Sequence, residues 1–137
     1  EFVTRKISDG AAQIKLGVRE HISLGNLDAL RDWGFAGDYV QMMWKMLQQD
    51  SPEDYVIGTG ETHSVREFAD MAFKCVGLNY EDHVVQDQRF MRPSEVDILI
   101  CNPAKARQKL AWEPKVKFQG LVEMMVETDL KRLKDTL

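Results

Sequence analysis

Residues 26–40, which read NLDALRDWGFAGDYV, are the most informative stretch of this sequence. It predicts Arg31 in a loop, followed by Asp38, a residue type that caps the amino termini of helices. A guanidinium stays charged at all physiological pH values and offers a planar fork of donors that suits phosphate oxygens. An isolated Arg-Asp pair would indicate only a surface turn. The hypothesis that Arg31 binds a diphosphate therefore depends on the surrounding sequence.

Six segments, in family order, resemble the GDP-mannose 4,6-dehydratases, which are extended short-chain dehydrogenase/reductase enzymes. They are spread over nearly the whole chain, and six ordered matches are hard to obtain by chance. The segments are residues 2–7, 25–40, 52–60, 63–68, 92–97 and 105–114.

Two motifs of that family do not occur in this sequence. The family holds its cofactor pyrophosphate on a Gly-rich turn between a strand and a helix, and no Gly-x-x-Gly-x-x-Gly occurs here. Its chemistry needs a Tyr-x-x-x-Lys pair, yet none of Tyr39, Tyr55 and Tyr80 has a Lys four residues later. The resemblance therefore implies a carboxyl-terminal portion, residues 1–137, that binds the nucleotide-sugar and whose NADP-binding and catalytic residues lie upstream.

Composition and charge exclude several other classes of function. The sequence has 18 Lys and Arg against 22 Asp and Glu, a net charge of −4, which argues against a general nucleic-acid binder. No apolar run is long enough to cross a bilayer, so no membrane partner is expected. The scattered His residues, together with Cys75 and Cys101, lack metal-ligand spacing. Free thiols indicate a reducing compartment, and we expect a cytoplasmic protein.

Apolar periodicity predicts a mixed α/β chain dominated by helices. The class implied by the resemblance is the carboxyl-terminal part of a Rossmann-like extended short-chain dehydrogenase with its small helical substrate-binding domain. Residues 38–77 would contain the last Rossmann strand and helices. Helices are expected at 3–16, 38–50, 64–76, 102–110 and 120–133, and strands at 21–24, 54–58, 83–85 and 97–101.

The helix predicted to begin at Asp38 has a regular apolar stripe. Its members are Val40, Met43, Trp44 and Leu47. In a carboxyl-terminal portion this face would lose the sheet that it covers, and we expect it to be exposed. The next helix carries a capping box, because Ser64 is followed three residues later by Glu67.

The family match places six residues on the GDP-sugar. Arg31 and Arg92 would reach the diphosphate, where two guanidinium forks give charge-assisted bonds that Lys cannot reproduce. Glu95 offers lone pairs to a ribose hydroxyl or a base N–H, although a surface ion pair with Arg92 would also explain it. The six residues are Val3, Lys6, Asn26, Arg31, Arg92 and Glu95.

The other three candidates have simple structural alternatives. Lys6 could meet a phosphate or a base carbonyl, but it could also be a solvated charge. Val3 could form an apolar wall or belong to the core. Asn26 lies in a turn where Asn is common for backbone reasons, and the neighbouring Trp33 favours packing over ligand stacking.

The activity implied by the resemblance is that of an NADP-dependent lyase. In the family the cofactor takes a hydride from C4 of GDP-mannose, water is lost across C5–C6, and the hydride returns to C6. The product is GDP-4-keto-6-deoxymannose, on the route to GDP-fucose, and the complete enzyme is expected to be a homo-oligomer, a dimer or tetramer. Two alternatives remain: a sister nucleotide-sugar epimerase or reductase, and a non-catalytic GDP-sugar-binding fragment.

Overall fold

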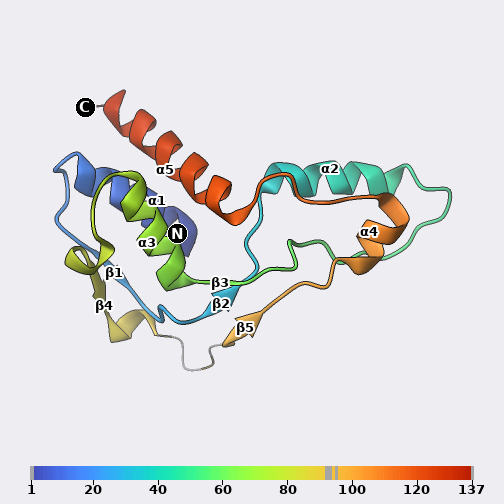
Figure 1. The fold of residues 1–137 in the computed structure, drawn as a ribbon, viewed down its shortest axis with the longest axis horizontal. Helices are drawn as coiled ribbons and strands as arrows, with labels where there is room; N and C mark the ends of the chain where they lie inside the picture. The colour runs from blue at the N-terminus through green and yellow to red at the C-terminus, as the bar shows by residue number, and fades with distance from the viewer. Residues whose placement is uncertain (1, 92–93, 95, 137) are drawn as a thin grey trace. The chain divides into compact units, whose positions relative to one another are not determined.

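The computed structural model describes residues 2–91, 94 and 96–136 (Figure 1). The chain passes back and forth between two compact units. The first unit consists of Glu1–Ala29, Ser64–Asp97 and Val122–Leu137. The second consists of Leu30–His63 and Ile98–Leu121.

The first unit is a small helical layer on a two-stranded parallel sheet. β1 and β4 pair with Ile22 opposite Val84 and Leu24 opposite Gln86. Helices α1 and α3 pack against each other (Figure 1). The elements are α1 (Val3–Lys15), β1 (Ile22–Leu24), α3 (Val65–Cys75), β4 (Val84–Gln86), the 3-10 turns η1 (Tyr80–Asp82) and η2 (Gln88–Phe90), and most of α5 (Phe118–Lys134).

Apolar side chains at helical spacing form the core of this unit. Ile7 and Ala11 on α1, and Phe68 and Phe73 on α3, are fully buried. Gly10 lets α1 approach β1, because a Cβ there would lie only 2.5 Å from a methyl carbon of Ile22. Any side chain at this position would push the helix away from the strand.

Helix α3 begins at the predicted capping box. The Ser64 hydroxyl accepts a hydrogen bond from the Glu67 N–H at 3.0 Å, and the Glu67 carboxylate accepts the Ser64 N–H in return. Two N–H groups that the helix itself cannot satisfy are thereby paired.

The second unit is built on short strands and two helices. β2 pairs in parallel with β5, with Leu30 opposite Ile98 and Arg31 opposite Leu99, and the strand order is β3-β2-β5. A small core joins Met42, Ala106, Leu110 and Trp112. The elements are β2 (Leu30–Arg31), α2 (Ala36–Leu47), β3 (His63–Ser64), β5 (Ile98–Leu99) and α4 (Ala104–Leu110).

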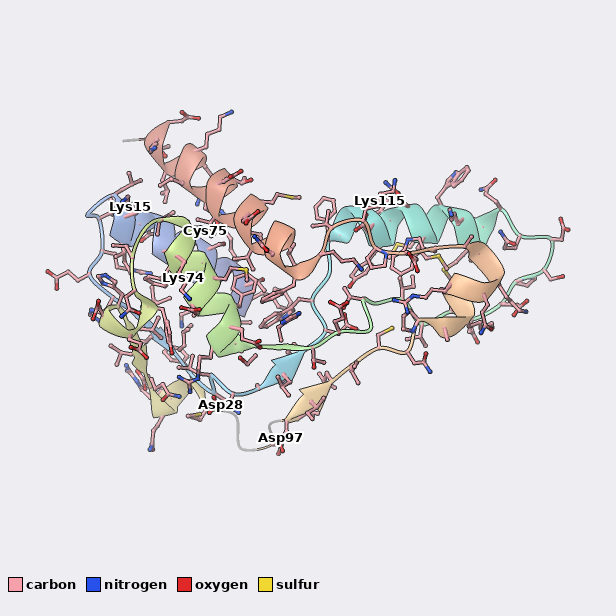
Figure 2. All side chains as sticks on the ribbon, viewed as in Figure 1. Lys15, Asp28, Lys74, Cys75, Asp97 and Lys115 are labelled. Carbon is pink, nitrogen blue, oxygen red and sulfur yellow. The ribbon has the colours of Figure 1, made fainter. Side chains whose placement is uncertain are left out.

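The prediction that Asp38 caps α2 is wrong. The helix begins two residues earlier, at Ala36, and Asp38 lies in its first turn, 3% exposed. Its carboxylate accepts the backbone N–H groups of Lys115 and Val116 at 2.9 and 3.0 Å instead. Figure 2 labels Lys115 in the segment that runs past α2. The carboxylate therefore ties a distant loop to the helix and does not satisfy the helix's own N–H groups.

The predicted strand at 54–58 does not form. Residues 52–57 run as irregular chain, and Val56 is 60% exposed. Tyr55 and Ile57 still pack on the Met42 core. Within the described residues no strand pairs with this segment, and a strand without hydrogen-bonded neighbours has nothing to hold it in register.

The apolar face predicted for α2 is exposed, as expected for a portion that lacks the rest of its sheet. Val40, Met43, Trp44 and Leu47 are between 55% and 82% exposed. The helix buries its other side, through Met42 and its neighbours. We define these four residues as the α2 apolar face. The other expected helices and strands are present in the described chain, shifted at their ends by a few residues. No helix in the described ranges is long and apolar enough to cross a membrane.

Removing the Ser64 cap should destabilise α3. We expect Ser64→Ala to lower the free energy of unfolding by about 1 kcal/mol, because one orphan N–H loses its acceptor. Urea unfolding followed by circular dichroism measures the change. The exposed loop residue Ser51 provides the matched Ser51→Ala control, which should stay close to wild type. Equal stability of both variants would contradict the role of the cap.

The α2 apolar face should make the isolated chain associate. A contiguous exposed patch of large apolar side chains favours burial against another surface. We expect concentration-dependent sedimentation of the 137-residue chain, and a shift to smaller species in Trp44→Glu. Val18→Glu, which removes an exposed apolar residue outside the α2 apolar face, serves as the control. A monomer at all concentrations would contradict the expectation.

Candidate functional site

Arg31 ends strand β2 in the second unit, and this corrects the loop predicted for it. Pairing of Arg31 with Leu99 of β5 fixes its backbone. Its Nη1 donates a hydrogen bond to the Leu30 carbonyl at 2.8 Å. The side chain is half-buried, so the strand presents a guanidinium from a defined backbone position.

The carboxylate of the next residue, Asp32, accepts four hydrogen bonds within this unit. Oδ1 accepts the Thr59 N–H at 2.8 Å and the Thr59 hydroxyl at 2.6 Å. Oδ2 accepts the N–H groups of Gly60 and Cys101 at 2.9 and 3.1 Å. We call Asp32, Thr59, Gly60 and Cys101 the Asp32 cluster.

Two opposing effects set the charge of Asp32. Partial burial raises the pKa of its carboxyl, whereas hydrogen bonds from Thr59, Gly60 and Cys101 lower it, and the net pKa is below its usual range. The carboxylate is therefore ionised throughout the physiological range. Burial, together with the nearby charge of Asp32, raises the pKa of the Cys101 thiol, which stays protonated.

Glycine makes the close approach within the Asp32 cluster possible. A Cβ at Gly58 would lie 2.4 Å from the Cys101 Cβ and 3.0 Å from the Asp32 Oδ2. Gly60 has a φ of +78°, a conformation that other residues rarely adopt. The turn at 58–60 thus donates the N–H groups of Thr59 and Gly60 to a carboxylate.

Trp33 packs inside the second unit. The Trp33 ring stacks on the Phe118 ring with their centroids 5.9 Å apart. The His63 ring also stacks on the Phe118 ring, with their centroids 3.8 Å apart. The packing expected for Trp33 is confirmed.

A separate, open cavity of about 450 Å³ lies in the first unit. Three of its lining residues are cationic, namely Lys6, Arg19 and Arg89, and Glu20 adds one carboxylate. The Lys6 ammonium lies 3.7 Å from the centre of the Phe90 ring. A cation over an aromatic face, next to further positive charge, suits an anionic or electron-rich planar ligand.

Asn26 is used by the backbone. Its side-chain oxygen accepts the Asp28 N–H at 2.9 Å, which closes a local turn. This is the structural alternative weighed for Asn26 in the sequence. Within the described residues, no group of three or more His, Cys, Asp and Glu side chains could hold a metal ion.

Comparison with known proteins decides the family. The family described as GDP-mannose 4,6 dehydratase matches residues 1–125. GDP-mannose 4,6 dehydratase 1 of Arabidopsis thaliana is 54% identical over 133 residues, which are 97% of this chain and 37% of that protein. The chain belongs to the GDP-mannose 4,6-dehydratase family. It corresponds to a carboxyl-terminal portion and spans less than half the length of this relative.

Solved structures share the fold. RMD from Pseudomonas aeruginosa, determined with NADPH, superposes with a TM-score of 0.86 at 19% identity, covering 96% of this chain and 43% of that one. UDP-glucose 4-epimerase of Thermotoga maritima, determined with UDP-glucose, gives 0.76 at 26% identity, covering 93% and 40%. The expected α/β fold of an extended short-chain dehydrogenase is confirmed.

Only some of the predicted site residues lie among the residues that the structure describes. Arg31 and Asn26 are placed as above, and Val3 and Lys6 lie half-buried on α1. Arg92 and Glu95 lie outside the described residues, so their roles in this family member stay predictions. The Asp32 cluster was not predicted, and its one signal was the Asp that follows Arg31. Arg19 and Arg89 gave no signal, because single charges far apart in the sequence form no motif.

Protonation of Asp32 should cost stability only at acid pH. Its folded pKa lies below the unfolded reference of 3.8, so its contribution is complete above that pH and is lost as the pH falls through the folded pKa. We expect wild type to exceed Asp32→Asn in free energy of unfolding at neutral pH, with the gap closing below about pH 3.8. Urea midpoints across this range measure it, with exposed Asp50→Asn as charge control. A constant gap would contradict the linkage.

Proposed function

We propose that the complete protein is an NADP-dependent GDP-mannose 4,6-dehydratase, a lyase, and that this chain binds its GDP-sugar substrate. The observation that carries the proposal is the 54% identity to the Arabidopsis thaliana GDP-mannose 4,6 dehydratase 1 across 97% of the chain. The reaction converts GDP-mannose to GDP-4-keto-6-deoxymannose with loss of water. This product is a precursor of deoxysugars such as GDP-fucose.

Arg31 is the residue of this chain that supports nucleotide binding best. A diphosphate is a dianion or trianion whose oxygens accept paired hydrogen bonds, and a half-buried guanidinium supplies them with less competition from water. Arg92 would supply a second fork to the same diphosphate. Glu95 would accept a hydrogen bond from the ribose or the base.

Lys6 is supported by its cavity. An ammonium group over Phe90, with two further cations nearby, provides positive charge for phosphate or for a base carbonyl. Val3 would add apolar surface on the same helix. Asn26 would contact the sugar-nucleotide from its turn, with its side-chain oxygen already engaged by Asp28.

The cofactor belongs to residues outside this chain. The sequence has no Gly-rich strand-to-helix turn that could hold a pyrophosphate. We assign residues 1–137 to the carboxyl-terminal nucleotide-sugar-binding portion, with 38–77 containing the end of the Rossmann part. The complete enzyme would be a cytoplasmic homo-oligomer.

One observation favours a second candidate. The Thermotoga maritima UDP-glucose 4-epimerase shares the fold at 26% identity, so the chain could serve a sister nucleotide-sugar enzyme. Product analysis separates the two, because an epimerase or reductase forms no 4-keto-6-deoxy sugar. A non-catalytic protein would bind GDP-sugars without turnover.

The test is product formation by the full-length protein and by the 137-residue chain. We expect the full-length protein, given NADP and GDP-mannose, to form a product that has lost one water, detected by mass spectrometry. The 137-residue chain alone should give none, because it has neither a cofactor turn nor a Tyr-Lys pair. Absence of product from the folded full-length protein would refute the activity, and turnover by the chain alone would refute the division of roles.

Loss of a guanidinium fork should weaken GDP binding. We expect Arg31→Ala and Arg92→Ala in the full-length protein each to lose about 1.5–3 kcal/mol, or about ten- to a hundredfold in affinity. Arg31→Lys should recover only part, because a point charge cannot chelate two oxygens. The double variant should depart from additivity through the shared ligand.

Calorimetric titration with GDP at one salt concentration measures these effects. Lys109→Ala is the control, because it removes an exposed positive charge that pairs with Glu53 in the second unit. Wild-type affinity in well-folded Arg31→Ala and Arg92→Ala variants would return both arginines to the role of surface charges.

A further inference from the structure

Asp32 directly follows β2, whose pairing with β5 is very short. Strands β2 and β5 are two residues each, and a pairing this short is marginal by itself. The Asp32 N–H extends it with a hydrogen bond to the Leu99 carbonyl at 3.0 Å. Its carboxylate then holds the 59–60 turn and the chain at Cys101 through four hydrogen bonds. The backbone of Arg31 is therefore fixed immediately downstream by the Asp32 cluster.

The carboxylate is unsuited to contact the nucleotide itself. A diphosphate would be repelled by it, and both of its oxygens already accept two hydrogen bonds each. Three of the four donors are backbone N–H groups, whose dipoles offset the negative charge locally. Any effect of Asp32 on nucleotide binding would then act through the adjacent residue, Arg31.

We propose that Asp32 is a positioning residue that sets the backbone of Arg31 for diphosphate binding. The inference rests on the proposed function, because it assigns Arg31 to the diphosphate. A guanidinium must meet two phosphate oxygens in one plane, so a small displacement of its backbone breaks one of the two bonds. Four hydrogen bonds to a single carboxylate fix that backbone more tightly than a two-residue strand can.

Asparagine tests this geometry with little change in shape. An amide has one acceptor oxygen and one NH₂ group, so one side of the cluster would face donor against donor. Asp32→Asn should loosen the chain next to Arg31 and weaken GDP binding of the full-length protein about tenfold. Thr59→Val removes only the hydroxyl donor and should give a smaller loss in the same direction.

The control is a second hydrogen-bonded carboxylate of the same unit. Asp38 also accepts two backbone N–H groups, from Lys115 and Val116, but it lies on α2 and does not adjoin Arg31. Asp38→Asn should lower stability without changing GDP affinity in the folded protein. The comparison separates loss of a structural carboxylate from loss of positioning.

The deciding experiment is a double-mutant cycle. GDP is titrated by calorimetry into full-length wild type, Asp32→Asn, Thr59→Val and Asp38→Asn, and into the same three variants built on Arg31→Ala, under conditions where circular dichroism shows each protein folded. We expect Asp32→Asn and Thr59→Val to weaken binding in the wild-type background and to have no further effect once Arg31 is absent.

The other outcomes overturn the inference. Unchanged affinity in Asp32→Asn, or in Thr59→Val should Asp32→Asn not fold, would remove the positioning role. An equal loss with and without Arg31 would show that Asp32 acts elsewhere, and an equal loss in Asp38→Asn would show a general structural effect. If Arg31→Ala itself binds GDP normally, the assignment of Arg31 fails and the inference fails with it. If only Arg31→Ala weakens binding, the assignment stands and the inference alone fails.

Discussion

The second unit is organised around the partly buried carboxylate of Asp32 and the four donors that satisfy it. A partly buried charge destabilises the folded chain unless it is hydrogen-bonded. The donors that satisfy Asp32 come from other segments, so the carboxylate holds three segments of the chain together. The segments after β2, before Gly58 and after β5 also share the small apolar core around Met42, on which Ile57 packs. The hydrogen bonds to Asp32 add a polar constraint on their mutual position. This explains why glycine is needed at 58 and 60, where a larger residue would separate the donors from Asp32.

The sequence predicted those features that local chemistry determines. The capping box at Ser64 and the apolar spacing of Ile7, Ala11 and Phe68 depend on neighbours a few residues apart, so the pattern was sufficient. Asp38 shows the limit of such reasoning. Its residue type fits a helix cap, yet its carboxylate accepts the N–H groups of Lys115 and Val116, about 77 positions away. No local sequence pattern reveals so distant a partner.

The same limit applies to the site. Arg31 could be singled out because a family motif surrounds it, whereas the turn at 59–60 that supports its neighbour is distant in sequence. The strand expected at 54–58 failed for a different reason. Its residue pattern suits a strand, but a strand exists only with a hydrogen-bonded partner, and none pairs with it among the residues described. Helix α2 carries apolar residues on two sides: the side with Met42 meets the core of this chain, and the predicted apolar face stays exposed because the sheet expected to cover it is not in this portion.

The interleaving of the two units has a consequence for synthesis on the ribosome. The second unit needs only the segments up to Leu121, whereas the first also needs Val122–Leu137, the last part of α5. Asp129 in that part accepts a hydrogen bond from Ser8 at 2.7 Å and pairs with Arg5, both in α1. A contact that spans more than a hundred residues closes a long loop and forms late. During translation α1 is synthesised before Asp129, so the interval in which Arg5 and Ser8 lack that partner depends on the elongation rate as well as on folding chemistry.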